Sequence, residues 1–136
     1  MITGMVPSVQ NEILAVLEKS DFAFELTGSR YFGCSRVDSD YDFFAEHTLE
    51  TSQWLKSIGF ETTWNYKDLA IMEVLVHGEG NIHVQLIRPS MMTAKRIAQE
   101  VFKASGYVRP NRGLWDIALL IAAGVVPHDR QILIQE

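Results

Sequence analysis

Two aspartates separated by one residue are the part of this sequence that most clearly suggests chemistry. Asp40 and Asp42 flank Tyr41, and residues two apart in a β-strand project from the same face. Adjacent carboxylates repel each other unless a cation lies between them, and hard oxygen ligands of this kind select Mg²⁺ or Mn²⁺. Asp40 and Asp42 are therefore predicted to hold a metal ion and to form the catalytic pair. The alternative is a chance pair at the solvated start of a strand.

A second candidate motif, Gly28-Ser29-Arg30, precedes the aspartates in the sequence. A glycine after a buried strand lets the backbone approach a ligand closely, and the N–H groups that follow, with the Ser29 hydroxyl, can bind phosphate oxygens. Arg30 would add positive charge beside them. Alone, a Gly-Ser pair after a strand is mostly an ordinary turn. Together with the acid pair, whose metal ion could take triphosphate oxygens in its open positions, these residues are predicted to bind phosphate.

The elements that must position these motifs predict an α+β fold. Apolar residues at helical spacing predict helices over residues 8–20, 48–58, 91–104 and 114–123, with Ser8 and Thr48 as N-caps of the first two. Segments rich in aromatic and β-branched residues predict strands over residues 22–26, 41–45, 60–66, 69–76 and 82–87. We expect a mixed β-sheet with helices packed on it, in a single domain over residues 1–136, with one short helical turn after the first strand.

The segment LTGSRYFGCSRVDSDYDFF, residues 26–44, resembles the polymerase-β-like nucleotidyltransferases, especially their small single-domain members, including phage-encoded ones. That family has Gly-Ser after its first strand and Asp-x-Asp in its second. The resemblance implies a minimal nucleotidyltransferase fold and transfer of a nucleoside monophosphate from an NTP to a hydroxyl acceptor, with metal ions assisting and pyrophosphate leaving. It also implies that Gly28 and Ser29 hold the triphosphate, and that Asp40 and Asp42 hold the metals.

The sequence departs from that family at a third carboxylate, which a later strand normally supplies. The corresponding strand over residues 82–87 contains no acid, and His83 or Gln85 stands where an aspartate is expected. Glu73, on the preceding strand, could supply the carboxylate only if the hairpin register turns it to the same face. The alternative for Glu73 is a solvated strand residue. His77 and His83 could suggest zinc, but two histidines without a third ligand more often lie at strand ends, hydrogen-bonded or in solvent.

Two functions of different classes therefore remain open. The first is a metal-dependent nucleotidyltransferase that acts on a hydroxyl of a protein, a small molecule or an RNA end. The second is a catalytically inactive protein of the same fold, which binds a nucleotide or acts on a protein partner as an antitoxin-like inhibitor. The Gly-Ser and Asp-x-Asp motifs support the first, and the missing third carboxylate supports the second.

Composition limits the partners and the location that we expect. A net charge of -5 argues against a grip on long nucleic acid. The single cysteine, Cys34, excludes an internal disulfide and fits a reducing cytoplasm. The sequence lacks a basic leader with a long apolar run, and no stretch approaches about 18 apolar residues, so we expect a cytoplasmic protein without membrane contact. Basic side chains in the final third are expected on wet helix faces, although contact with an acidic partner, an RNA end or a triphosphate is the alternative: Lys95, Arg96, Lys103, Arg109 and Arg112.

Overall fold

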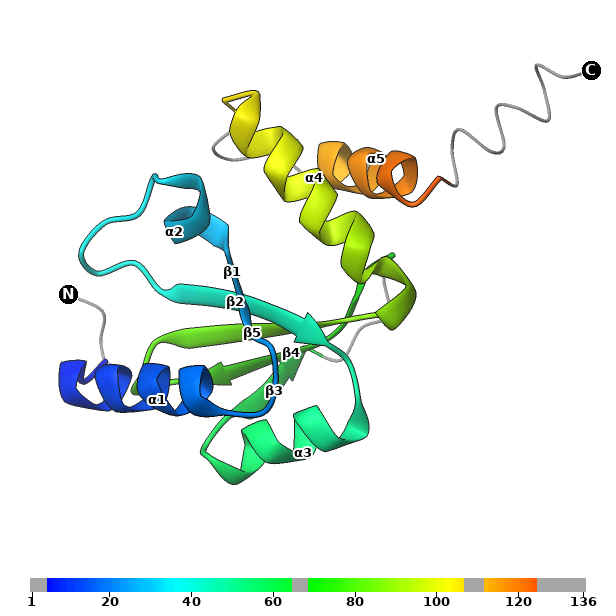
Figure 1. Cartoon of the computed structure of the whole chain (residues 1–136). Coiled ribbons are helices and arrows are strands. Elements are labelled where there is room, and N and C mark those ends of the chain that lie inside the picture. Colours follow the sequence, from blue (N-terminus) through cyan, green and yellow to red (C-terminus); the bar gives the residue numbers. More distant parts are fainter. Residues whose placement is uncertain (1–4, 65–68, 107–111, 125–136) are drawn as a thin grey trace, which may run out of the picture.

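Five strands form one mixed sheet within residues 5–64, 69–106 and 112–124, the part of the chain that the computed structural model describes (Figure 1). In spatial order they are β1 (Glu25–Thr27), β2 (Tyr41–Glu46), β5 (Ile82–Ile87), β4 (Ile71–His77) and β3 (Glu61–Trp64). β2 and β5 pair in parallel, and the other neighbouring pairs are antiparallel. The predicted α+β class with a mixed sheet is confirmed.

Helices cover both faces of this sheet. α1 (Pro7–Lys19) and α3 (Leu49–Ser57) lie against one face, while α4 (Met92–Ala104) and α5 (Arg112–Ala122) lie against the other (Figure 1). The short predicted turn after the first strand is α2 (Gly28–Phe32), and a 3₁₀ turn, η1 (Pro89–Met91), leads into α4. None of these described helices combines the length and the apolar character that a bilayer-spanning segment needs.

Local sequence signals explain where several elements begin and end. The Thr48 hydroxyl accepts a hydrogen bond from the Thr51 N–H at 3.0 Å and so caps α3, as predicted. Beyond the end of α3, Gly59 adopts a φ of +102°, which favours glycine. The predicted cap at Ser8 is wrong, because α1 already begins at Pro7. The fixed φ of proline suits the first position of a helix.

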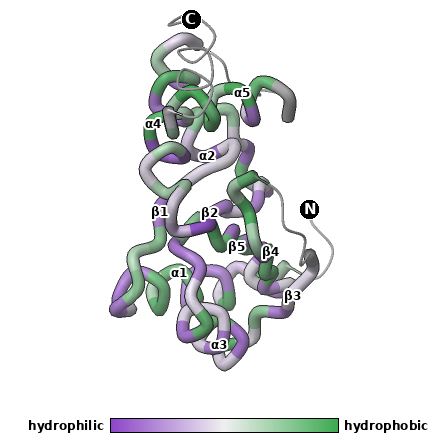
Figure 2. Tube along the Cα trace, turned by 90° about the vertical axis from the view of Figure 1, so that its right-hand side faces the viewer, coloured by the Kyte–Doolittle hydropathy of each residue, from purple (hydrophilic) through white to green (hydrophobic). Residues whose placement is uncertain are grey.

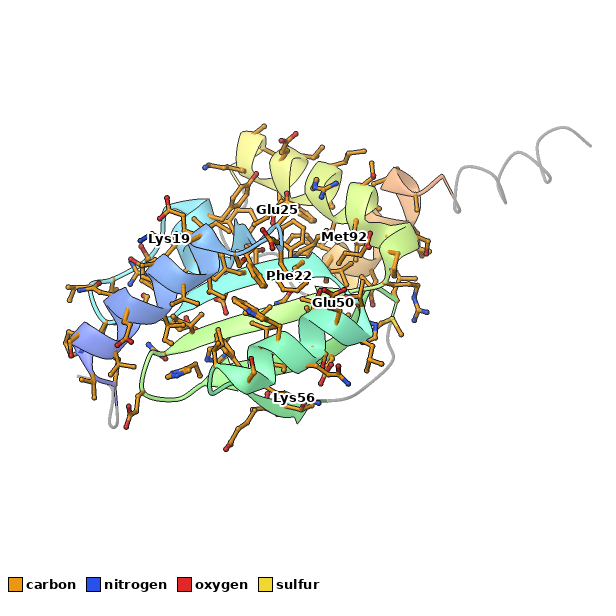
Figure 3. The ribbon with its side chains drawn as sticks, turned by 60° about the horizontal axis from the view of Figure 1, so that its bottom comes forward. Lys19, Phe22, Glu25, Glu50, Lys56 and Met92 are labelled. Atoms are coloured by element: carbon orange, nitrogen blue, oxygen red, sulfur yellow. The ribbon has the colours of Figure 1, made fainter. Side chains whose placement is uncertain are left out.

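The first strand also differs from its prediction. The sequence pattern predicted a strand over residues 22–26, but β1 begins at Glu25. Phe22 and Phe24 instead pack on Trp54 of α3, with ring centroids 5.2 and 5.9 Å away. Figure 3 shows Phe22 between α1 and α3. Aromatic packing against these helices therefore replaces strand pairing at these positions. Part of the predicted third strand, residues 65–66, lies outside the described residues.

Two groups of buried apolar side chains join the layers of the described structure. Between the sheet and α1 with α3 lie Leu17, Leu55, Leu75, Val84 and Leu86. Between the sheet and α4 with α5 lie Phe44, Ile87, Met92, Ala98 and Leu119. Figure 2 shows apolar segments in the central strands and again in α4 and α5. On this second face the sheet continues past α4 and α5 into the partly exposed start of β2, where the candidate site lies.

Candidate metal and nucleotide site

The parallel pairing of β2 with β5 places Asp42 directly opposite His83. One ligand atom from each of Asp40, Asp42 and His83 lies within 4.8 Å of the others. The imidazole Nε2 is 3.4 Å from Asp40 Oδ2, and Nδ1 is 4.0 Å from Asp42 Oδ1. We call these three residues the metal cluster. Two carboxylates suit Mg²⁺ or Mn²⁺, and the imidazole moves the preference towards Mn²⁺ and later transition metals.

The Gly-Ser turn lies against this metal cluster. Gly28 has a φ of +70°, and a Cβ atom built on it would overlap Asp42 Oδ2. β1 pairs with β2 so that Thr27 faces Asp42. The two motifs predicted separately therefore meet at one place, and the meeting depends on a residue without a side chain. Ser29 follows in the first turn of α2, where backbone N–H groups have no partner within the helix.

Arg30 reaches across to the chain segment that leads into β2. Its guanidinium donates to the backbone carbonyl oxygens of Ser39, at 2.7 Å, and of Asp40, at 3.2 Å. The same group lies 3.9 Å from the centre of the Tyr41 ring. Arg30 therefore positions the residues on either side of the first aspartate. Its direct contact with a nucleotide stays a prediction.

The Asp42 carboxyl holds its proton more tightly than an ordinary aspartate. Burial, followed by the charge of Asp40 and a hydrogen bond with it, raises the pKa of Asp42 to about 7, and Lys95 opposes this rise. Near neutral pH and without a cation, Asp42 therefore carries its proton in a substantial fraction of the molecules. A divalent ion would replace this proton and relieve the repulsion.

Lys95 was predicted to lie on a wet helix face, and this prediction is wrong. Its side chain is 7% exposed, on the side of α4 that faces the sheet. The ammonium Nζ lies 4.2 Å from the Trp115 ring centre and 5.5 Å from that of Phe44. Burial lowers the pKa of Lys95 to about 8, and the charge of Asp42 opposes this fall. The buried lysine therefore adds positive charge beside the metal cluster.

The spacing of α4 held a signal for this burial. Lys95 lies three residues after Met92 and seven before Phe102, and all three are buried on one side of the helix. Residues at this spacing share a face of a helix. A lysine that interrupts an apolar stripe is a candidate for a buried charge, and the stripe is visible in the sequence.

Glu73 does not complete the metal cluster. It pairs with Leu86 across the β4–β5 ladder, whereas His83 faces Val76, so Glu73 and His83 lie on opposite faces of the sheet. The expectation of a solvated Glu73 is equally wrong, because its side chain is buried and accepts hydrogen bonds from Ser52 and Thr62 at 2.8 and 2.5 Å.

The histidines do not form a shared zinc site. His77 pairs with Ile82, one position from His83 in the strand register, so the two histidines project from opposite faces. Within the described residues, the metal cluster contains no third carboxylate.

Comparisons with known proteins give no further guide to this site. No family model, curated protein or solved structure matches the chain. The resemblance over residues 24–44 therefore rests on its motifs.

The arrangement nonetheless limits the chemistry that the site can perform. A cation held by Asp40, Asp42 and His83 keeps open positions, because three side chains do not fill an octahedral shell. The Gly28-Ser29 turn, whose N–H groups can bind phosphate oxygens, lies against one of the same carboxylates, that of Asp42. The site thus fits an anionic ligand that carries several phosphate oxygens.

Proposed function

We propose that this protein is a metal-dependent nucleotidyltransferase that transfers a nucleoside monophosphate from an NTP to a hydroxyl acceptor. The observation that carries the proposal is the contact between the Gly28 backbone and Asp42 within the metal cluster. A turn suited to phosphate and an acid pair suited to Mg²⁺ or Mn²⁺ meet there. These are the two parts that a phosphoryl-transfer site needs, since such catalysis depends mainly on positioning and charge neutralisation.

Each residue of the site has a defined part in this reaction. Asp40, Asp42 and His83 would hold the metal, which neutralises phosphate charge and favours in-line displacement. Gly28 and Ser29 would orient the triphosphate. The acceptor oxygen forms a bond to the α-phosphorus while the bond to the bridging oxygen breaks, and pyrophosphate leaves. The acceptor proton passes to solvent.

One observation favours a second function. His83 lies opposite Asp42, where the resemblance calls for a carboxylate, and Glu73 lies on the other face. A protein with this change could bind a metal–nucleotide complex without turning it over, and act as a nucleotide sensor or an antitoxin-like inhibitor of a protein partner. In either case we propose a cytoplasmic protein whose ligands are an NTP and either a hydroxyl acceptor or a protein, rather than long nucleic acid.

Calorimetric titration of each NTP tests the proposal. Titrations with Mn²⁺, Mg²⁺ or EDTA would compare the wild type with the double variant Asp40→Asn/Asp42→Asn. Asp38→Asn is the matched control, because it removes an acid from the same segment but outside the metal cluster. We expect binding that requires the metal, is lost in the double variant and is kept in the control. Binding that ignores EDTA, or no binding of any NTP, would refute the proposal.

A turnover assay separates the two functions. Release of pyrophosphate from a bound NTP, with an acceptor mixture from cell extract, would support the transferase. Metal-dependent binding with no pyrophosphate release would support the inactive nucleotide-binding protein.

A further inference from the structure

A cavity of about 240 Å³ lies between β4 and β5 on one side and α4 and α5 on the other. The described residues that line it are Ala70, Ile71, Gln85, Ile87, Lys95, Trp115, Asp116 and Leu119. Pockets for whole drug-sized ligands usually measure about 300–1,000 Å³. This cavity therefore fits one ring system of a ligand rather than a complete nucleotide.

The polar groups of this cavity include an unsatisfied acceptor. The side-chain oxygen Oε1 of Gln85 is buried and has no hydrogen-bond partner in the described structure. A buried acceptor without a partner is costly, so a ligand donor at this atom would be favourable. Asp116 adds a carboxylate acceptor to the lining, and Lys95 adds the one charged donor among the described lining residues. Around these groups, Trp115 and aliphatic side chains offer a flat apolar wall.

The cavity lies within reach of the metal cluster. Gln85 follows His83 by two residues on β5 and projects from the same face. At about 3.3 Å per residue, the two side chains are about 7 Å apart along the strand. Lys95 lines the cavity, and its ammonium lies 5.5 Å from the ring centre of Phe44, which follows Asp42 by two residues on the same face of β2. A ligand that places phosphates at the metal cluster could therefore place a base in the cavity, with a ribose between them.

We propose that this cavity receives the base of the nucleotide and that it selects guanine. This inference rests on the proposed function. A base edge with two donors and one acceptor fits these groups, because the Asp116 carboxylate can accept from two donors and the Lys95 ammonium or the Gln85 amide N–H can donate to the acceptor beside them. Guanine has this edge, with N1–H and the 2-amino group as donors and O6 as acceptor. Uracil presents one donor between two acceptors, cytosine one donor and two acceptors, and adenine one donor and one acceptor.

Binding of separate parts of the ligand tests this inference apart from the proposed function. Guanosine without metal depends on the cavity alone, and inorganic tripolyphosphate with Mn²⁺ depends on the metal cluster and the Gly28-Ser29 turn. We expect both to bind. With Mn²⁺ present, GTP should bind at least about tenfold more tightly than ATP, CTP or UTP, and also more tightly than ITP, which lacks the 2-amino group.

Two variants and one control locate the selectivity. Gln85→Leu and Asp116→Asn should each reduce the preference for GTP over ATP by about tenfold and leave tripolyphosphate binding unchanged. Gln99→Leu is the matched control, because Gln99 also has a buried unpaired Oε1 but does not line the cavity. It should keep the GTP preference. Circular dichroism of each variant would confirm that the fold is retained.

The outcomes are distinguishable. Equal binding of all four NTPs, or a GTP preference that survives both cavity variants, overturns the cavity inference and leaves the proposed function standing. Guanosine binding without any metal-dependent tripolyphosphate binding supports the cavity inference and refutes the proposed function. Tripolyphosphate that binds as tightly as GTP overturns the cavity inference.

Discussion

Asp42→Asn is expected to stabilise the metal-free protein, although it alters a mostly buried polar residue in a central strand. The cause is the charge of the wild-type carboxylate. Burial and the neighbouring Asp40 raise the pKa of Asp42 from 3.8 to about 7, so its ionisation opposes folding. The asparagine side chain has the same shape, carries no charge and can still donate a hydrogen bond to Asp40.

The size of this effect follows from the pKa. The two values differ by about three pH units, and at about 1.4 kcal/mol for each unit the upper bound is about 4 kcal/mol. We expect about half of this, because Asp42 remains 20% exposed and because Lys95 loses an anionic partner in the variant. A gain of about 2 kcal/mol corresponds to a Tm increase of about 5–10 °C in a chain of this size.

The pH dependence has a definite sign. A raised pKa means that the folded state binds the proton more tightly than the unfolded state. The contribution of protonated Asp42 to the free energy of unfolding is therefore fully present below about pH 4. It is lost as the pH rises from about 4 to about 7, and above that pH the free energy of unfolding changes little from this cause. Asp42→Asn lacks this titration, so the two proteins should diverge between pH 4 and pH 7.

Urea unfolding at pH 4.5, 6 and 8 in EDTA would measure the difference, with Asp38→Asn as the control. Saturating Mn²⁺ should reverse the order at pH 8, since a ligand at 100 times its Kd adds about 2.7 kcal/mol to the wild type alone. A destabilised Asp42→Asn at pH 8, or a difference that is the same at all three pH values, would show that the carboxylates do not repel as argued.

Three further predictions concern single positions. Gly28→Ala should lower the free energy of unfolding by about 2–3 kcal/mol and weaken Mn²⁺ binding at least tenfold in calorimetry, because the added Cβ displaces Asp42. The control is Gly33→Ala, since Gly33 also has a positive φ, +78°, but has open space around it. This variant should lower the free energy of unfolding by about 1 kcal/mol and leave Mn²⁺ binding intact. Glu73→Ala should lower the free energy of unfolding by about 2–3 kcal/mol at pH 7, because the hydroxyl groups of Ser52 and Thr62 lose their acceptor. Mn²⁺ affinity should not change. Altered Mn²⁺ affinity would contradict the position of Glu73 on the face of the sheet opposite the metal cluster. His83→Asp should increase Mg²⁺ affinity relative to Mn²⁺ at pH 8, and an unchanged ratio would exclude the imidazole as a ligand.

The stability that Glu73 provides should also depend on pH. Burial raises the pKa of Glu73, but hydrogen bonds from Thr62 and Ser52 and the charges of Lys56 and His47 outweigh it and hold the pKa below 4.5. A lowered pKa means that the contribution is present at neutral pH and is lost as the pH falls below 4.5 and through the lower value. The difference between the wild type and Glu73→Ala should therefore shrink in acid.

Most elements of the fold follow from local patterns in the sequence. Thr48 and Gly59 mark the ends of α3, β-branched residues mark β4, and alternation of apolar residues marks β5, because these signals act within a few residues. The strand predicted over residues 22–26 failed because Phe22 and Phe24 pack on Trp54, which lies about thirty residues further along the chain. Contacts of that range override local strand propensity and leave no periodic pattern.

The site was predictable to the extent that its residues are close in the sequence. Asp40 and Asp42 were proposed from their spacing and Gly28 from its place after a strand, and the structure brings the three together. The face on which Glu73 lies depends on the register of a hairpin, in which one residue of slip reverses the side chain, and the β4–β5 pairing contains such a register shift. The environment of Gln85 depends on helices that cross the sheet from elsewhere in the chain, which spacing along one strand cannot reveal.

The buried Lys95 links these features through charge. Without a metal, Asp40 carries a charge of −1, protonated Asp42 carries none and protonated Lys95 carries +1. These three charges sum to zero. With a divalent ion and both aspartates ionised, the same groups carry a net positive charge, which attracts a triphosphate. The metal should therefore bind before or with the phosphates.

A lysine variant tests this charge argument. Lys95→Met keeps the length of the side chain and removes its charge, so we expect it to weaken tripolyphosphate binding about tenfold at saturating Mn²⁺ and pH 7. Lys103→Met is the control on the same helix, since Lys103 is exposed and lies over the Tyr31 ring. Equal affinity in Lys95→Met and the wild type would mean that the buried lysine contributes only packing, and that the attraction comes from the metal alone.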